Sequence, residues 1–217
     1  SHADRSNKTP YNTFDHSLRT LENVLDAIKF SKTVEQLIFM SSSMVYGNFD
    51  GKEVEEDMNC SPIGIYGALK YAAEKIIIAY NQVFGLNYTI IRPSALYGER
   101  CISRRVGQIF IENALFGKKI SINGSGKEKL DFTYIQDLIQ GISKSISNQK
   151  AYNEIFNITY GNGREILELI EIIKDNFGST EIEFKDKNKL TPERGTLSNA
   201  KSKELLKYES KWSIDCL

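Results

Sequence analysis

Tyr66 and Lys70, a tyrosine and a lysine four residues apart, stand at the start of an apolar helical segment. Residues at this spacing share one face of a helix, so the ammonium can lie beside the phenol. Bringing a phenol from its ordinary pKa of about 10 to about 7 takes roughly 4 kcal/mol of preference for the phenolate. One cation at about 4 Å in an effective dielectric of about 20 supplies on the order of 4 kcal/mol. The pair could therefore provide a general base near neutral pH.

A serine-rich stretch, residues 41–47, precedes this pair by about two dozen residues. It follows residues 36–40, a continuous apolar run that is typical of a buried parallel strand. A hydroxyl at the end of that strand could donate a hydrogen bond to the same reacting oxygen as the tyrosine. Two simpler interpretations remain open: the serines could merely cap the strand, and the tyrosine and lysine could be a solvated pair on an amphipathic helix.

The rest of the chain alternates between helical and extended patterns. Apolar residues at helical spacing predict helices over residues 13–30, 66–84, 104–116, 135–146, 164–177 and 200–206. Short apolar runs predict strands over residues 36–40, 87–91, 119–122, 131–134, 155–158 and 181–184, with loops over residues 48–63 and 94–103. The order helix, strand, helix, strand favours an α/β fold with a parallel sheet. Such sheets bind ligands at the carboxyl ends of their strands.

Composition narrows the class of protein. The 217 residues are 41% hydrophobic and 26% charged, as in an ordinary soluble globular protein. Lys+Arg and Asp+Glu number 28 each, which argues against a nucleic-acid partner. No apolar run approaches the roughly 20 residues that span a bilayer, so no membrane association is expected. Cys60, Cys101 and Cys216 are too widely spaced for a disulfide framework or a zinc site, so we expect a reducing cytoplasm and no metal.

Four segments together resemble the extended short-chain dehydrogenase/reductase family, specifically its NAD-dependent sugar-nucleotide epimerases and dehydratases. They are FMSSSMVYG at residues 39–47, SPIGIYGALK at 61–70, RPSALYG at 92–98, and NGSG at 123–126 followed by DFTYIQDL at 131–138. The resemblance implies a Rossmann-like parallel sheet with a smaller carboxyl-terminal α/β substrate lobe. Residues 1–98, with 131–158 returning to them, would form the Rossmann-like part, and residues 99–130 and 159–217 would form the substrate-binding lobe.

The resemblance also assigns roles to individual residues. Tyr66 would be the acid/base, Lys70 would lower the Tyr66 pKa and hold the nicotinamide ribose, and Ser42 would be the catalytic hydroxyl. Met44 stands where dehydratase-like members carry an acid, which favours epimerase or ketosugar-reductase chemistry over dehydration. The other implied contacts are Ser41 and Pro93 for the cofactor, NAD or NADP, and Ser43, Arg100, Arg104, Arg105 and Arg194 for the nucleotide-sugar substrate.

The sequence departs from the family pattern in its first part and at positions that normally contact phosphates. The family begins with a strand, a G-x-x-G-x-x-G turn and a helix that hold the cofactor diphosphate, and no such turn occurs in this sequence. Ala95 and Leu130 replace a family asparagine and arginine. The sheet is therefore expected to be truncated on its amino-terminal side, and cofactor binding by these residues alone to be impaired.

Two classes of function follow from these patterns. The first is an NAD(P)-dependent sugar-nucleotide epimerase or related ketosugar oxidoreductase with a Ser-Tyr-Lys site. The second is a noncatalytic fragment or pseudoenzyme that acts as a dimerising module. In either class the resemblance implies a homodimer formed through the helices at residues 13–30 and 66–84.

Overall fold

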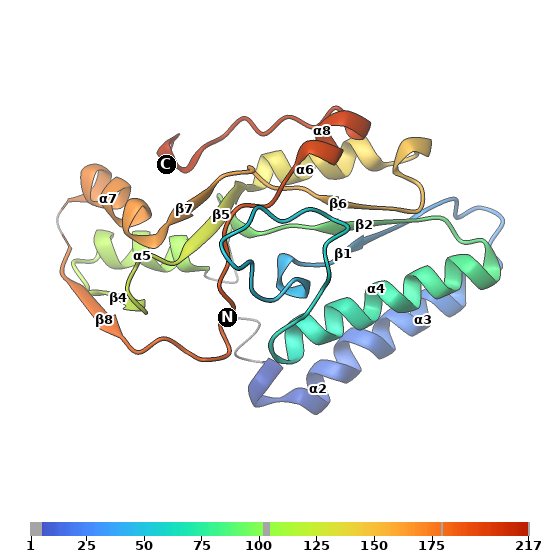
Figure 1. Cartoon of the computed structure of the whole chain (residues 1–217), viewed down its shortest axis with the longest axis horizontal. Helices are drawn as coiled ribbons and strands as arrows, with labels where there is room; N and C mark the ends of the chain where they lie inside the picture. The colour runs from blue at the N-terminus through green and yellow to red at the C-terminus, as the bar shows by residue number, and fades with distance from the viewer. Residues whose placement is uncertain (1–5, 102–104, 179, 217) are drawn as a thin grey trace.

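The computed structural model describes residues 6–101, 105–178 and 180–216, in which helices and strands alternate (Figure 1). The helices are α2 (Pro10–Phe14), the π-helical turn η1 (Asp15–Arg19), α3 (Thr20–Ile28), α4 (Gly64–Phe84), α5 (Val106–Leu115), α6 (Ile135–Ser145), α7 (Ile166–Phe177) and α8 (Ala200–Leu206), with 3-10 turns η2 (Ser43–Val45), η3 (Gln149–Ala151) and η4 (Ile214–Cys216). The strands are β1 (Leu37–Met40), β2 (Tyr88–Arg92), β3 (Ala95–Tyr97), β4 (Ile120–Asn123), β5 (Lys129–Tyr134), β6 (Glu154–Asn157), β7 (Gly163–Glu165) and β8 (Ile182–Lys185).

A parallel sheet of three strands, in the order β1-β2-β6, is covered by helices on both faces. Strand β2 is buried along its whole length, and its side chains alternate between two cores. Tyr88 and Ile90 pack with α3 and α4, whereas Ile91 packs with α6 and α8. Figure 1 shows α3 and α4 side by side below the sheet and α6 and α8 above it. This layering confirms the predicted α/β class with a parallel sheet.

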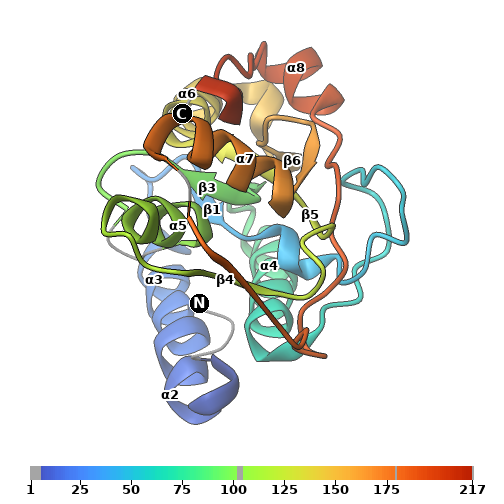
Figure 2. The same cartoon turned by 90° about the vertical axis from the view of Figure 1, so that its left-hand side faces the viewer.

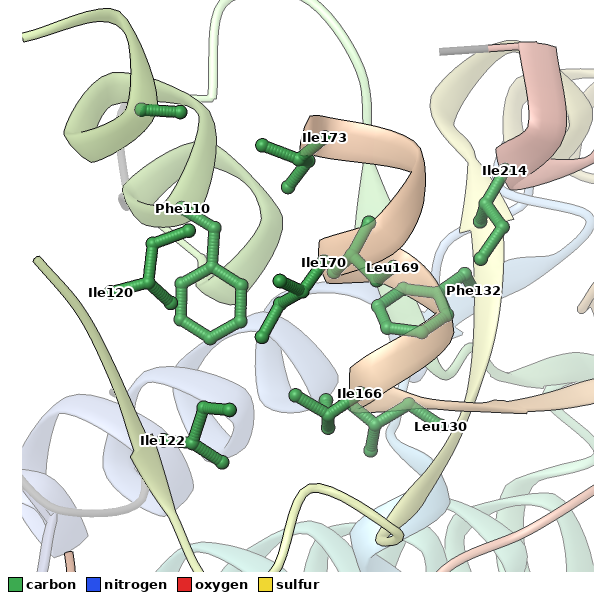
Figure 3. Close-up of a cluster of buried hydrophobic side chains, with 11 residues drawn as sticks. Phe110, Ile120, Ile122, Leu130, Phe132, Ile166, Leu169, Ile170, Ile173 and Ile214 are labelled. Atoms are coloured by element: carbon green, nitrogen blue, oxygen red, sulfur yellow. The ribbon is translucent and has the colours of Figure 1, made fainter. Parts of the chain in front are cut away.

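A second group of elements lies beside this sheet. Strand β3 pairs with β5 in parallel, β5 pairs with β7 in antiparallel fashion, and β4 pairs with β8 in parallel. Their apolar side chains form a separate core with α5 and α7, in which Phe110, Ile120 and Ile170 point toward one another (Figure 3). Each group of elements therefore has a core of its own.

Two short strands differ from the sequence prediction. Strand β3 lies in the predicted loop 94–103, and β7 occupies the start of the helix predicted from residue 164. Each has three residues and is defined by its pairing with β5, a partner distant in sequence that no local pattern reveals. The assignment of residues to a Rossmann-like part and a substrate-binding lobe stays a prediction.

Two kinds of feature are absent from the described ranges, a bilayer-spanning helix and a cluster of metal-binding side chains. No helix there is long and apolar enough to cross a bilayer. No group of three or more His, Cys, Asp or Glu side chains there could hold a metal ion. The groups that converge are instead hydroxyls, an ammonium and guanidiniums at the carboxyl ends of β1 and β2.

Candidate functional site

Ser42 and Tyr66 meet at the carboxyl end of β1. Ser42 has an extended backbone just after the strand, and its Oγ accepts a hydrogen bond of 3.2 Å from the Met44 N–H at the start of η2. Tyr66 is half-buried in the first turn of α4, and the Ser42 hydroxyl is near enough to lower the pKa of its phenol. Strand and helix thus bring two hydroxyls together, as an acid/base group with a supporting donor requires.

Gly67 allows the first turn of α4 to approach η2 closely. A Cβ at this position would lie 2.6 Å from the Met44 carbonyl oxygen and 3.1 Å from the Cβ of Pro62. The first of these separations is shorter than real Cβ contacts allow, so a larger residue would push the helix away. The close approach keeps Tyr66 within reach of Ser42.

Lys70 contacts the end of β1. Its Nζ donates a hydrogen bond of 2.7 Å to the Met40 carbonyl oxygen and lies 4.8 Å from the centroid of the Phe39 ring. Burial lowers the pKa of Lys70, while the charge of Glu74, one helical turn later, acts in the opposite direction. The strand end therefore provides the contacts that compensate for partial burial of the ammonium.

Tyr66 has a raised pKa in this structure. Burial is the main cause, and the Ser42 hydrogen bond and the Arg105 charge oppose it without reversing it. The sequence predicts Lys70 as the group that lowers this pKa, whereas Ser42 and Arg105 are the groups that do so in the structure. A phenol with a raised pKa keeps its proton at neutral pH, so Tyr66 here is a hydrogen-bond donor rather than a base.

Arg105 and Arg194 lie close enough to repel each other. Arg105 is exposed and precedes α5 in an extended conformation, and Arg194 is half-buried. Burial, and next the charge of Arg105, lower the pKa of Arg194 to about 10. Within the described ranges no carboxylate forms an ion pair with either guanidinium. Two like charges without an acidic partner form a site that a bound anion would stabilise.

The backbone around Arg194 is anchored to the loop that follows η2. The Phe49 N–H donates a hydrogen bond of 2.8 Å to the Glu193 carbonyl. The Val54 N–H donates one of 3.1 Å to the Thr196 carbonyl. These bonds lie on either side of Arg194 in the sequence, so they fix the backbone from which its guanidinium projects.

Three more of the predicted contact residues lie at the ends of β1 and β2. The Ser43 N–H donates a hydrogen bond of 2.9 Å to the carbonyl of Pro93, which is itself buried. The Ser43 hydroxyl is buried and has no hydrogen-bond partner in the part of the chain that the structure describes. The Ser41 hydroxyl, by contrast, donates to Glu74 over 2.5 Å. Ser43 is therefore the serine whose hydroxyl could still be satisfied by a bound molecule.

Of the other predicted or expected phosphate contacts, Arg100 and Leu130 are not joined to this cluster. Arg104 lies outside the described residues. Arg100 is exposed beside Glu99, whose pKa is lowered by a hydrogen bond from Tyr134 and, to a smaller extent, by the Arg100 charge. Leu130, at the position of a family arginine, is buried in the core shown in Figure 3. Arg105 and Arg194 are thus the predicted arginines that the structure brings together.

A buried ion pair beneath the site has no counterpart among the sequence predictions. Arg92 Nη2 lies 2.6 Å from Glu74 Oε2, and Arg92 Nε donates to Glu74 Oε1 over 3.0 Å. The two residues are only 2% and 1% exposed. Charged residues are almost never so buried unless they are paired. The local signals are weak: an arginine that ends an apolar strand and a glutamate within an apolar part of a helix.

Comparison with known proteins identifies the family. Residues 1–159 match the profile of the NAD dependent epimerase/dehydratase family. The chain belongs to this family. A relative described as an uncharacterized UDP-glucose epimerase, YtcB of Bacillus subtilis, is 30% identical over 200 residues, which cover 92% of this chain and 63% of the relative. The family resemblance inferred from the sequence motifs is confirmed.

Two solved epimerase structures share the fold of this family member. UDP-glucuronic acid 4-epimerase of Bacillus cereus, in complex with UDP-glucuronic acid and NAD, is 27% identical with a TM-score of 0.87, over 92% of this chain and 63% of that one. UDP-glucose 4-epimerase of Thermotoga maritima, with UDP-glucose, is also 27% identical with a TM-score of 0.88, over 99% of this chain and 70% of that one. The chain therefore spans 63% of the length of the B. subtilis relative and of the B. cereus enzyme.

Proposed function

We propose that this chain carries the acid/base and substrate-binding groups of an NAD-dependent sugar-nucleotide epimerase. The observation on which the proposal rests is the approach of the Ser42 hydroxyl to the Tyr66 phenol at the carboxyl end of β1, with Lys70 one turn further along the same helix. The epimerases of UDP-glucose and UDP-glucuronic acid that resemble the chain support this substrate class.

Tyr66 would exchange a proton with the sugar hydroxyl that becomes a ketone. Ser42 would donate a hydrogen bond to the same oxygen and so hold it near the phenol. Bound NAD would supply the hydride acceptor, and then the hydride donor, for the carbon that bears this oxygen. Met44 beside Ser42 carries no acid that could expel water, which favours epimerisation over dehydration.

The residues present fit the nicotinamide ribose of NAD better than they fit its diphosphate. Lys70 offers ammonium donors that suit ribose hydroxyls beside Tyr66. Ser43 offers a buried hydroxyl without a partner among the described residues, which suits its predicted contact with the substrate. For the cofactor diphosphate, the sequence contains no glycine-rich turn of the family type. The lack of such a turn supports our proposal that residues 1–217 alone are impaired in cofactor binding and turnover.

Arg105 and Arg194 would bind the diphosphate of the nucleotide sugar. A diphosphate between them would replace their mutual repulsion with charge-assisted hydrogen bonds. The charge of Arg105 also lowers the pKa of the Tyr66 phenol, so the same guanidinium lies near both the acid/base group and Arg194. This arrangement would place the sugar next to Tyr66 when the diphosphate is held.

Arg194→Met should weaken the binding of UDP to this chain about tenfold to a hundredfold, because hydrogen bonds to charged groups contribute about 1.5–3 kcal/mol. Isothermal titration calorimetry of UDP, with dTDP for comparison, measures the change. Lys203→Met removes one positive charge from the exposed side of α8 and should leave binding unchanged. Equal affinities for the Arg194→Met and unmodified chains, or no measurable binding of UDP by either, would contradict the assignment.

Apolar side chains exposed on adjacent helices support a second candidate function, that of a noncatalytic dimerising module. They are Tyr11 and Phe14 on α2, Val24 on α3, and Ile65 and Val83 on α4. Figure 2 shows α2 and α3 extending below the sheet beside α4. An apolar surface shared by neighbouring helices is typical of a protein interface. The homodimer through these helices stays a proposal for either function.

Phe14→Asp should convert a dimer of this chain into a monomer, because it places a charge on the exposed apolar surface of α2. Light scattering should then report a mass of 24.6 kDa, the mass of one chain, in place of twice that value. Phe184→Asp, at a residue that is 55% exposed on β8, is the matched control and should not change the mass. A monomeric unmodified chain would rule out the dimer, whereas a dimer that binds neither UDP nor NAD would favour the noncatalytic module.

A further inference from the structure

Asp131 on β5 is a buried carboxylate whose hydrogen-bond donors are backbone N–H groups. It is 0% exposed, and within the described ranges no lysine or arginine forms an ion pair with it. The Leu197 N–H donates to its Oδ2 over 3.2 Å, and the Gly161 N–H lies 3.2 Å from both of its oxygens. Because a buried charge is costly unless such bonds compensate for its desolvation, these contacts are what keeps the carboxylate in place. It joins β5 to two segments that are distant in the sequence.

The neighbouring strand β7 lies against the backbone that follows Arg194. Gly163 of β7 is opposite Asp131 in the pairing of the two strands. A Cβ on Gly163 would lie 2.7 Å from the Gly195 carbonyl carbon and 2.9 Å from the Thr196 nitrogen, so the two backbones are in close contact. The Gly163 N–H also donates a hydrogen bond of 2.9 Å to Thr196 Oγ1.

The backbone that carries Arg194, residues 193–197, has two sets of anchors, and we call it the Arg194 segment. The loop after η2 donates hydrogen bonds to two of its carbonyls. Strands β5 and β7 bond the Leu197 N–H and the Thr196 hydroxyl. Asp131 supplies the charge-assisted bond of the second set, and such bonds are about twice as strong as neutral ones.

We propose that Asp131 is a positioning residue, which holds the Arg194 segment against β5 and so fixes the Arg194 guanidinium for the diphosphate of a nucleotide sugar. The role given to Arg194 rests on the proposed function. The hold of Asp131 on the segment is a property of the unliganded chain and is measured without nucleotide. Burial raises the pKa of Asp131 to about 6, although the Leu197 and Gly161 N–H groups oppose the rise. The group is therefore ionised at about pH 8, where the measurements are made.

Hydrogen exchange of the folded chain without nucleotide tests this hold. In Asp131→Asn an NH₂ group replaces one carboxylate oxygen. Because the Gly161 N–H contacts both oxygens, a donor then faces a donor whichever way the amide is turned. Relative to the amides of β2, the Leu197 amide should exchange about threefold to tenfold faster, the change that loss of one hydrogen bond produces.

Asp137→Asn is the matched control, because it makes the same substitution at a second buried carboxylate with backbone donors. Asp137 on α6 is 2% exposed, and its Oδ2 accepts hydrogen bonds from the Lys211 and Trp212 N–H groups over 3.0 and 3.1 Å. This variant should leave the exchange of the Leu197 amide and the binding of nucleotide sugar unchanged.

Isothermal titration calorimetry of UDP-glucose tests the consequence for Arg194. Asp131→Asn should weaken binding about threefold to tenfold, and Thr196→Val, which removes the hydroxyl bonded to Gly163, should weaken it too. In an Arg194→Met background neither substitution should weaken binding further, because residues that act through one group are not additive. A general loss of stability would instead add to the loss caused by Arg194→Met.

Three results would overturn the role of Asp131. They are an unchanged exchange rate of the Leu197 amide in Asp131→Asn, an equal fall in UDP-glucose affinity with and without Arg194, and failure of Asp131→Asn to fold while Thr196→Val folds and binds UDP-glucose normally. No binding of UDP-glucose by the unmodified chain would contradict the proposed function. The exchange of the Leu197 amide would then decide by itself whether Asp131 holds the Arg194 segment.

Discussion

Tyr66→Phe should abolish epimerisation in a protein that has a complete cofactor site. The substitution removes the phenol oxygen of the proposed acid/base in the first turn of α4 and leaves the ring to pack as before. Loss of a positioned acid/base lowers turnover by about 10²- to 10⁴-fold. The assay is UDP-glucose turnover by a fusion in which the amino-terminal dinucleotide-binding segment of the B. subtilis relative precedes this chain. We expect NAD binding to rise in the fusion and to be weak in the chain alone.

Tyr80→Phe is the matched control for this experiment. Tyr80 lies on the same helix, and its ring packs against Phe84 with 5.2 Å between centroids, toward the opposite end of α4. Its phenol has no part in the proposed chemistry, so turnover should stay within about twofold, well inside the loss expected for an acid/base group. NAD binding is measured separately for both variants. Turnover retained by Tyr66→Phe in a fusion that binds NAD would refute the role of Tyr66.

The position of the acid/base stretch can be predicted from sequence because it depends on local patterns. Helical spacing places Tyr66 and Lys70 on one face, and an apolar run ending in serines places Ser42 at the carboxyl end of a strand. The structure has these elements at α4 and β1. The approach of the Ser42 hydroxyl to the Tyr66 phenol follows from two elements whose boundaries the sequence already indicates.

The electrostatic surroundings of this stretch depend on tertiary contacts that local patterns do not contain. The sequence predicts Lys70 beside the phenol, but no local pattern shows that its ammonium also donates a hydrogen bond to the Met40 carbonyl at the end of β1. The partial burial of Arg194 and its repulsion by Arg105 join residues almost ninety positions apart. No local sequence pattern around either arginine predicts that the two side chains lie close enough to repel each other.

Glu74→Ala should destabilise the folded chain by about 3–5 kcal/mol, the usual loss when one partner of a buried ion pair is removed. It leaves the Arg92 guanidinium, which is 2% exposed, without the carboxylate that accepts two of its hydrogen bonds. Urea denaturation followed by circular dichroism measures the free energy of unfolding. Glu74→Gln/Arg92→Met should recover much of the loss, because no unpaired charge stays buried.

Lys201→Met provides the comparison that distinguishes burial from pairing as the cause of this loss. Lys201 pairs with Glu154 over 2.7 Å, but both side chains are about one third exposed. Exposed pairs contribute about 0–1 kcal/mol, so this variant should unfold at nearly the same urea concentration as the unmodified chain. Equal small losses for Glu74→Ala and Lys201→Met would show that water reaches Arg92 and satisfies it.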